Sequence, residues 1–444
     1  MTNTQMIKNL VALEPELDIV KVEEIKEKGK VVKVIHISSS RTKVRCIHCN
    51  KFTRCVHDKL KPIKIKYLDM AGYTSYLMVH KRRFNCSNCG KRFTEENFVN
   101  GTKKTVSYKL EQKILMDLRD YNLSLTYIAE HNNVSDNEVR KILKDYMKNH
   151  PTYLKTLPSV ISFDEFKADT RNGKYAFIIN DLLHKKTLDI LPSRKKDDLI
   201  QYFASVENRS SVQYVVSDMY EPYLIVTTIM FPNAKYVADR FHYTKYIMDA
   251  IDNVRIRLQE KYGYKTKEYR FLKNKKNVSL LRKYSNEISW WVEQERYRNG
   301  RVIRILPGEI IQELLRIDDD LKRAYQLKEL FLDIVHHVEL EDVERQLLEW
   351  IDLCKASKIE EFIEASNTIN NWLEYIVNSY IDKRLSNGFT EGLNNKIKVI
   401  KRVGFGYKTF SFFRLRLLYI LNSKKMKNGN SEKNKNSKKQ KIKN

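Results

Sequence analysis

The stretch RLSNGFTEGLNNKIKVIKR, residues 384–402, contains residue types that suit chemistry on a phosphate group. If the stretch is a helix, residues three, four and seven positions apart share one of its faces. The polar residues with that spacing are Glu391, Asn394, Asn395 and Lys398. A carboxylate two turns before a lysine suits a metal ion that faces a phosphate backbone. The same face could be the solvated side of an ordinary amphipathic helix, and partner carboxylates upstream would decide between the two.

Five upstream segments alternate between apolar and polar residues as β-strands do. Three of them follow one another, a helix is predicted over residues 196–206, and two more strands come after it. The strand segments are residues 161–166, 174–183, 186–192, 212–223 and 234–243. Three hairpin-like strands, a helix and two further strands is the order of the ribonuclease H-like fold, an α/β architecture. We therefore predict the first part of such a core in residues 158–243.

Two aspartates occupy key positions in this predicted core. Asp164 lies on the first strand and Asp218 ends the fourth. In the ribonuclease H-like fold these positions lie side by side at the centre of the sheet, and a carboxylate on a later helix faces them. Glu391 is the candidate for that third position. Two aspartates and a glutamate can hold two Mg²⁺ or Mn²⁺ ions roughly 3.5–4 Å apart, which activate an attacking oxygen and stabilise a leaving oxygen in phosphoryl transfer.

Two Cys-x-x-Cys pairs indicate a zinc-binding module in residues 35–100, after an N-terminal segment of residues 1–34. The four cysteines are Cys46, Cys49, Cys86 and Cys89. Four thiolates give zinc a closed tetrahedral site, so we expect one structural Zn²⁺, with a β-hairpin between the two pairs. His48, Cys55 and His57 remain alternative ligands. Lys and Arg flank both pairs, which favours a module that lies on phosphate.

A helix-turn-helix DNA-binding domain is predicted in residues 104–149. The sequence SLTYIAEH forms the first helix of the pair, HNNV forms the turn, and Ser135 with Glu138 forms a capping box for the second helix. An apolar stripe on the second helix consists of Val139, Ile142, Leu143 and Tyr146. The outer face carries residues that reach base edges and phosphates, namely Asn137, Arg140, Lys141 and Lys144. A plain helical hairpin is the alternative.

The composition favours a polyanionic partner. The net charge is +27 and the pI is near 9.6, and nucleic acid is the first candidate. The longest strongly apolar run, residues 223–231, is too short to span a bilayer. The N-terminal sequence lacks the apolar core of a signal peptide. We expect a cytoplasmic protein, associated with the nucleoid when bound to DNA, in a reducing compartment that favours metal-bound cysteines over disulfides.

Three further segments complete the predicted organisation. Residues 244–383 contain amphipathic helices without strand alternation and are predicted to be an all-α insertion, in which the tryptophans serve mainly for core packing. Residues 384–422 return to the ribonuclease H-like core and contain the glutamate helix. Residues 423–444 contain nine lysines and one glutamate with almost no apolar residues, which is typical of a disordered basic tail.

With these residues located, the chain resembles the DDE transposases of bacterial insertion sequences, most closely the ISL-three group. The motifs that carry the resemblance are FDEF around Asp164, VVSDMYEPY around Asp218, VADRFHY around Asp239 and SNGFTEGLNNKIKVIKRVGFGY around Glu391. The resemblance implies that Asp164, Asp218 and Glu391 are the catalytic metal ligands. It also implies that Lys398 contacts the DNA end. Asp239 and His242 match the family's pattern as accessory residues, and Asp239 is either a fourth ligand or a residue that orients the site.

The resemblance further implies a mechanism and partners. A metal-activated water cleaves double-stranded DNA at the ends of the element, and the exposed 3′ hydroxyls then attack target DNA. The zinc module and the helix-turn-helix would bind the terminal inverted repeats, and Lys401 and Arg402 would contact phosphates beside the cut. A homodimer or larger assembly would hold two ends. The rival functions are a DNA-binding regulator with a catalytically silent ribonuclease H-like domain, and a nuclease or resolvase that only hydrolyses DNA.

Overall fold

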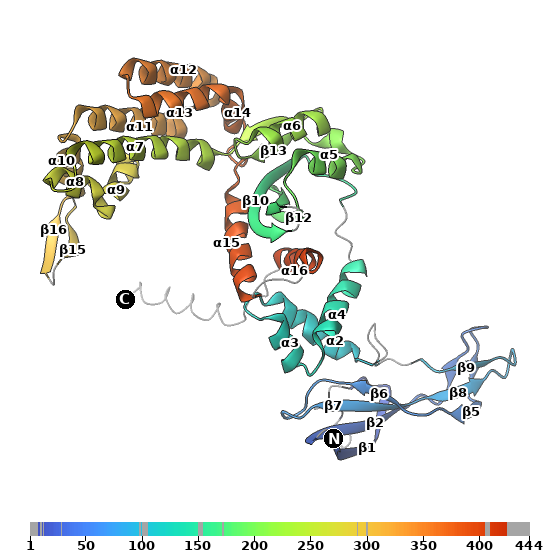
Figure 1. The fold of residues 1–444 in the computed structure, drawn as a ribbon. Helices are drawn as coiled ribbons and strands as arrows, with labels where there is room; N and C mark the ends of the chain where they lie inside the picture. The colour runs from blue at the N-terminus through green and yellow to red at the C-terminus, as the bar shows by residue number, and fades with distance from the viewer. Residues whose placement is uncertain are drawn as a thin grey trace, which may run out of the picture. The chain divides into compact units, whose positions relative to one another are not determined.

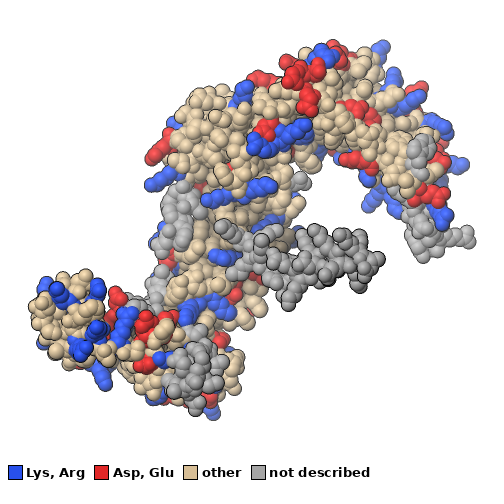
Figure 2. All heavy atoms as spheres, turned by 180° about the vertical axis from the view of Figure 1, so that it is seen from behind, with Lys and Arg blue, Asp and Glu red and all other residues tan. Residues whose placement is uncertain are grey.

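The computed structural model describes residues 13–27, 29–96, 105–149, 154–170, 173–290, 292–298, 301–404 and 409–423, together with Lys8, Val11 and Val99. Nearly all of the predicted basic tail therefore lies outside the described residues. The chain divides into two compact units, residues 1–152 with 396–444 and residues 153–395 (Figure 1). Lys and Arg side chains are spread widely over the surface that Figure 2 shows, consistent with the excess of basic residues.

A four-stranded sheet opens the first unit. Its strand order is β1-β2-β7-β6, with bounds β1 Leu17–Glu27, β2 Lys30–Ser39, β6 Ile63–Lys66 and β7 Ser75–His80. β1 pairs antiparallel along the whole of β2. The sheet buries one apolar face around Ile37, Ile65 and Leu77. The boundary that we placed between residues 34 and 35 therefore falls inside β2, because β1 needs β2 as its hydrogen-bonding partner.

Two smaller sheets hold the cysteine pairs. The first consists of β3 Val44–Arg45 and β4 Phe52–Thr53, and the second of β5 Val56–Lys59, β8 Arg82–Asn85 and β9 Arg92–Thr94. Phe84 and Phe93 are buried with Cys46 and Cys86 between these sheets. As predicted, a β-hairpin, β6 with β7, separates the two cysteine pairs along the chain.

Three helices follow, α2 Tyr108–Arg119, α3 Leu125–His131 and α4 Asp136–Asn149. The predicted capping box is confirmed, because the Ser135 N–H donates to Glu138 Oε2 at 2.9 Å and the Glu138 N–H donates to Ser135 Oγ at 3.2 Å. The turn between α3 and α4 includes Asn133 with a positive φ of 52°. Val139, Ile142 and Leu143 of the predicted stripe are buried. The helix pair therefore has the predicted bounds and the predicted inner face.

A fourth helix from the far end of the chain, α16 Phe410–Asn422, packs with α2 and α4. Arg119 Nε donates to the Tyr419 hydroxyl at 3.0 Å, and that hydroxyl donates to the Leu115 carbonyl at 2.9 Å. This differs from our expectation that residues 384–422 all belong to the catalytic core. The sequence FSFFRLRLLYILN has apolar residues around most of the helix, so α16 needs burial on several sides, and the inner faces of α2 and α4 contribute to it.

Arg416 on α16 links it to the end of α2. This side chain is 1% exposed, and its Nη2 donates to the carbonyls of Leu123 at 2.5 Å and Asp120 at 3.4 Å. We predict that Arg416→Ala lowers the free energy of unfolding of this unit by about 2–4 kcal/mol, because buried acceptors lose their donor and a void forms. Faster hydrogen exchange in α2 and α16 would show the effect.

The tryptophans provide an internal control for that measurement. All four lie in residues 153–395, so tryptophan fluorescence during urea unfolding reports the other unit and should not change. Arg414→Ala, at a half-buried position on the same helix, is the matched variant and should have the smaller effect. Equal exchange in wild type and Arg416→Ala would contradict the prediction.

The second unit is built on a five-stranded sheet with the order β12-β11-β10-β13-β14. The bounds are β10 Val160–Thr170, β11 Gly173–Asp181, β12 Lys186–Leu191, β13 Tyr214–Ser217 and β14 Lys235–Ala238. The first three strands pair antiparallel, and β13 and β14 continue parallel to β10. Helices α5 Lys196–Ala204 and α6 Glu221–Met230 cover one face, packing on Phe163 and Phe177 (Figure 1). All five predicted strands are present, but the predicted fourth and fifth segments, residues 212–223 and 234–243, extend past β13 and β14 into the starts of α6 and of α7, Arg240–Tyr262.

A helix-rich block follows the sheet. Its elements are α7 Arg240–Tyr262, α8 Lys267–Lys273, α9 Lys275–Arg282, α10 Pro307–Leu315, α11 Asp319–His337, α12 Leu340–Ser357, α13 Glu360–Asn371 and α14 Leu373–Val377, with short 3₁₀ turns η2 Ser285–Glu287 and η3 Asn378–Tyr380. A further turn, η1 Arg209–Ser211, precedes β13. Trp350 is buried and donates from Nε1 to the Leu327 carbonyl at 2.8 Å. The predicted packing role is confirmed for Trp350, and Trp291 lies outside the described residues.

The expectation of an all-α insertion is wrong at one place. Strands β15 Gln294–Arg298 and β16 Arg301–Ile305 form an antiparallel hairpin in which Arg298 pairs with Arg301. The two residues between them in the sequence are Asn-Gly, the dipeptide most favoured in two-residue hairpin turns. The turn signal was therefore present, but the long helical patterns on both sides concealed it. Within the described residues, no helix combines the length and apolar character needed to cross a membrane.

Candidate active site and zinc centre

Two aspartates lie on neighbouring parallel strands, Asp164 within β10 and Asp218 directly after β13. Ser162 of β10 is level with Val216 of β13, and Ser217 Oγ donates to the Phe163 carbonyl at 3.1 Å. Two residues beyond the paired position on each strand come Asp164 and Asp218. The structure therefore brings these two predicted site residues together at the centre of the sheet.

Asp164 is a buried carboxylate, 9% exposed. Its Oδ1 accepts the Glu165 N–H at 2.6 Å, and its Oδ2 accepts a hydrogen bond from Asn394 Nδ2 at 2.8 Å. Burial, and after it the negative charge of Asp218, raises the pKa of Asp164 to about 7. A cation at this position would offset both causes, because it would replace the lost solvation and neutralise the repulsion.

Asp218, Asp239 and His242 form a second part of the same cluster, with one ligand atom of each within 4.8 Å of the others. His242 Nε2 lies 2.8 Å from Asp218 Oδ1. Burial alone would lower the pKa of His242, but the hydrogen bond to Asp218 and the charges of Asp218, Asp239 and Asp164 outweigh it and raise the pKa. The imidazole thus carries a proton more readily here than in water and partly balances the acidic cluster.

Asp239 follows β14 directly and connects the cluster to the glutamate helix. The side chain is 4% exposed, and its Oδ1 accepts the Asn387 N–H at 2.9 Å. Asn387 immediately precedes α15 Gly388–Val403. Burial raises the pKa of Asp239, although a carboxylate at a helix N-terminus is stabilised by the backbone N–H groups there. Asp239 therefore helps to place the start of α15.

The start of α15 lies against the face of the sheet opposite α5 and α6 (Figure 1). Thr390 Oγ1 lies 3.2 Å from Ser162 Oγ and accepts a hydrogen bond from Asn180 Nδ2 at 3.1 Å. One turn later, Asn394 contacts Asp164. Glu391 lies between these two contact positions on the helix, but its side chain is outside the described part of the structure.

The predicted DNA-contacting residues are spread over α4 and the second half of α15. Asn137, Lys141 and Lys144 are exposed, as are Lys398 and Arg402, whereas Lys401 is half-buried. Arg140 differs from the expectation of an outer-face residue. Its guanidinium lies 4.4 Å from the centroid of the Phe412 ring, so part of its role is to pack α4 on α16.

The sequence reasoning missed a cluster next to Asp164. Glu165 and Asp181 were not among the predicted site residues. Glu165 pairs with Arg194 and accepts the Tyr223 hydroxyl at 2.7 Å, whereas Asp181 serves a turn by accepting the His184 N–H at 3.0 Å. Strand alternation could have identified the difference, because Glu165 points to the opposite face from Asp164. That face is buried, so a carboxylate there needs a partner.

The four predicted zinc ligands come together in the first unit. Within the described residues their Sγ atoms all lie within 4.8 Å of one another, with Cys46 and Cys89 3.7 Å apart and Cys49 and Cys86 3.5 Å apart. A tetrahedral site with Zn–S bonds of about 2.3 Å has edges of about 3.8 Å. The alternative ligand Cys55 is exposed and outside this group. The donor set therefore fits one zinc ion.

The two cysteine pairs are held by identical backbone turns. The Cys46 N–H donates to the Lys51 carbonyl and the Cys86 N–H donates to the Lys91 carbonyl, at 2.9 and 3.0 Å. Asn50 and Gly90 occupy the same position in each turn with φ of 60° and 70°, where glycine and asparagine are the residues that best tolerate a left-handed backbone. The sequence pattern Cys-x-x-Cys-Asn/Gly thus forms two zinc knuckles.

Comparison with known families identifies both parts of the chain. A zinc-finger family of the transposases of IS204, IS1001, IS1096 and IS1165 matches residues 42–89. The ISL3 family of DDE transposases matches residues 161–417, more than half of the chain. The chain belongs to this ISL3 transposase family. Its members are enzymes that cut and transfer DNA, and the buried aspartates described above lie within the matched residues.

Individual relatives agree with the family. The transposase of insertion sequence IS1001 from Bordetella parapertussis is 23% identical over 389 residues, which cover 86% of this chain and 90% of the relative. The transposase of IS1557 from Mycobacterium tuberculosis is 23% identical over 245 residues, 54% of this chain and 55% of that protein. A protein named as an ATP-dependent protease of Lactococcus lactis matches only 28% of this ISL3-family chain, at 30% identity, and carries no argument about the whole.

Proposed function

We propose that this ISL3-family transposase binds the terminal inverted repeats of an insertion sequence and catalyses Mg²⁺-dependent strand cleavage and strand transfer. One observation supports this most directly. Asp164 and Asp218 each lie two residues beyond the last paired position of β10 and β13, and Asn394 donates to Asp164 at 2.8 Å, so the helix turn that contains Glu391 lies close to both aspartates. Three carboxylates from three elements can meet there.

We also propose that the core is ribonuclease H-like. The support is the strand order β12-β11-β10-β13-β14, with three antiparallel strands followed by two parallel ones. A helix that contains the third carboxylate packs on the opposite face from α5 and α6. The ligand crevice of such a sheet lies at the carboxyl ends of its parallel strands.

In this proposal Asp164, Asp218 and Glu391 hold two Mg²⁺ or Mn²⁺ ions. When bound, the ions lower the pKa of the attacking hydroxyl and stabilise charge on the leaving oxygen. The carboxylates supply the hard oxygen donors that these ions prefer. Asn394 keeps Asp164 in one orientation, and Asp239 holds the start of α15 in place.

The proposed reaction is two displacements at phosphorus. In the first, a water oxygen forms a bond to the phosphorus at the end of the element and the bond to the 3′ oxygen breaks, so that the 3′ oxygen leaves as a hydroxyl. In the second, that hydroxyl attacks a phosphorus in target DNA and displaces a target 3′ oxygen. His242 beside Asp218 is placed to hold a proton near the reacting oxygens. No covalent protein–DNA intermediate is needed.

DNA recognition is proposed for the first unit. Helix α4 presents Asn137, Lys141 and Lys144 on its exposed face, as a recognition helix in a helix-turn-helix does. Lys398 and Arg402 are proposed to contact phosphates beside the cut, and the zinc module to bind backbone through its basic surface. A dimer or larger assembly would hold two ends together.

The decisive experiment uses the DNA that flanks the coding region. Imperfect inverted repeats there would supply the substrate, and the purified protein should cleave them only with Mg²⁺ or Mn²⁺. It should then join precleaved ends to a target plasmid. Binding without cleavage would favour the regulator, and cleavage without joining would favour a nuclease or resolvase.

Two substitutions separate the possible roles of Asp239. Asp239→Asn keeps an oxygen that can accept the Asn387 N–H but removes the charge, whereas Asp239→Ala removes both. If Asp239 is a metal ligand, we expect both variants to lose at least about 100-fold in cleavage rate. If it only orients α15, Asp239→Asn retains most activity and Asp239→Ala loses about 1 kcal/mol of stability. Single-turnover cleavage and thermal unfolding distinguish the outcomes.

A further inference from the structure

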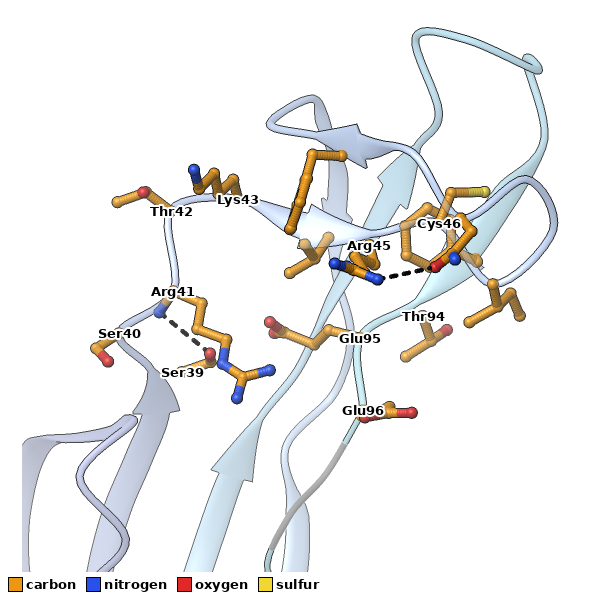
Figure 3. Close-up of a pocket in the computed structure, with 15 residues that line it drawn as sticks. Ser39, Ser40, Arg41, Thr42, Lys43, Arg45, Cys46, Thr94, Glu95 and Glu96 are labelled. Atoms are coloured by element: carbon orange, nitrogen blue, oxygen red, sulfur yellow. Dashed lines mark hydrogen bonds between the residues drawn. The ribbon is translucent and has the colours of Figure 1, made fainter.

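A groove of about 790 Å³ opens beside the first zinc knuckle. One wall is the segment Ser39–Ile47, which leads through β3 into the first cysteine pair, and the other is Phe93–Glu96 at the end of β9. Asn50 and Phe52 complete the lining. Figure 3 shows Arg41, Arg45 and Glu95 around the space between these two segments. We call this space the knuckle groove.

The knuckle groove is basic despite the two glutamates in its lining. Glu95 is buried, and its carboxylate accepts hydrogen bonds from Arg82 Nε at 3.1 Å and from Arg82 Nη2 at 2.7 Å. It also accepts the Arg82 N–H at 2.7 Å. Arg82 neutralises Glu95, and Arg41 is paired with Glu16, which does not line the groove. The exposed side chains of Lys43 and Arg45 therefore outweigh the one remaining carboxylate, Glu96. The groove therefore suits an anionic ligand.

An exposed aromatic ring lies among these cations. Phe52 is 53% exposed, with Lys43 Nζ 5.2 Å and Arg45 Cζ 5.0 Å from its ring centroid. Arg45 is also oriented by a hydrogen bond to Asn50 Oδ1 at 3.5 Å. Ile47, next to the zinc ligand Cys46, is 67% exposed. Single exposed apolar residues are ordinary on a surface, but here apolar and cationic groups alternate at the lip of a groove.

A nucleic-acid backbone has the complementary alternation, because charged phosphates are separated by the apolar faces of the sugars. We propose that the knuckle groove holds duplex DNA, with Lys43 and Arg45 each on a backbone phosphate and the Phe52 ring packed against the deoxyribose between them. A zinc ion bound by Cys46 would stiffen the wall that contains this residue, so that Lys43 and Arg45 keep their spacing. The proposal rests on the proposed function, since its ligand is the end of the element.

Salt dependence of binding tests the two kinds of contact separately. The zinc-loaded full-length protein is titrated against a labelled duplex that carries the inverted repeat, between about 50 and 200 mM salt. Lys43→Ala and Arg45→Ala should each reduce the slope of log K against log[salt] by about 0.9, since one phosphate contact is lost. Phe52→Ala should weaken binding about fivefold at every salt concentration without changing the slope, because the ring has no charge. Phe52→Leu should retain most of the affinity.

Matched controls come from β5, whose residues do not line the groove. Lys59→Ala and Val56→Ala remove one exposed charge and one exposed apolar side chain, and both should leave affinity and slope unchanged. Zinc content of one ion per chain in every variant excludes a loss of folding. Wild-type protein that does not bind the repeat would overturn the proposed function. Two results would overturn only the proposal that the knuckle groove holds DNA. In the first, the wild type binds but Lys43→Ala and Arg45→Ala leave the salt slope unchanged. In the second, Lys59→Ala reduces the slope as much as they do.

Discussion

Replacing Cys46 and Cys49 with serine will release the zinc ion and unfold the two knuckles. The four Sγ atoms hold together two turns that come from distant parts of the sequence, and only Phe84 and Phe93 with a few partly buried neighbours pack between them. Structural zinc stabilises such modules by on the order of 10 kcal/mol, far more than this small core can supply. We expect metal analysis to fall from one zinc per chain to none, and binding to the inverted repeat to be lost.

Cys55→Ser is the control for that experiment. Cys55 is exposed and lies outside the four-cysteine group, so this variant should keep its zinc and its DNA affinity. Addition of a chelator to the wild type should reproduce the double variant, and added Zn²⁺ should reverse the effect. A double serine variant that keeps one zinc per chain would show that other ligands hold the metal.

Asp164→Asn should abolish catalysis and at the same time stabilise the metal-free protein. We expect cleavage of the element end to fall by about 10³-fold or more, because one oxygen ligand loses its charge. The stability effect follows from the pKa of Asp164, which burial and Asp218 raise to about 7. In an unfolded chain an aspartate has a pKa of about 3.9, so the native state is the one that binds the proton more tightly.

The sign of the pH dependence follows by linkage. As the pH rises from about 4 to 7, the unfolded chain has released this proton and the native state still holds it, so the wild type loses stability over this range. The amide side chain that replaces Asp164 in the variant has no such proton to lose. The gain from Asp164→Asn should therefore be small at pH 4 and reach about 4 kcal/mol by pH 8. Thermal unfolding in chelator measures this difference, and Mg²⁺ should stabilise only the wild type.

Asp181→Asn is the matched control. Asp181 is also buried and also lies in the sheet, but its partner is the turn residue His184. This variant should keep cleavage activity. The prediction is contradicted if Asp164→Asn is less stable than the wild type at pH 8, or if it still cleaves DNA at near the wild-type rate. Either result would show that Asp164 is not a metal ligand.

The parts of the fold that were predictable from the sequence are those with local signals. Strand alternation located β10 to β14, and the positions of Asp164 and Asp218 in the predicted ribonuclease H-like strand order indicated that they meet. The capping box of Ser135 and Glu138 is a contact three residues apart, and the cysteine pairs carry their own turn geometry. Helix periodicity also placed Asn394 on the face that contacts Asp164.

The parts that escaped prediction depend on pairing between distant segments. Periodicity showed that α16 is apolar on most sides. The helices that cover it, α2 and α4, lie about 300 residues earlier in the chain, and no local sequence pattern identifies them as its partners. Glu165 has two partners, Arg194 in the loop between β12 and α5 and Tyr223 of α6. Strand β1 has a mixed charged sequence whose strand character depends on pairing with β2.

The place of α16 also has a consequence for the synthesis of the protein. Arg119 and Tyr419, which bond to each other, are 300 residues apart. At about 5–20 residues per second, on the order of 15–60 s pass between translation of α2 and of α16. During that interval the growing polypeptide holds α2, α3 and α4 with part of their apolar surface uncovered. The helices that are proposed to read DNA are thus completed last, so a ribosome that stops early leaves an aggregation-prone fragment instead of a finished DNA-binding unit.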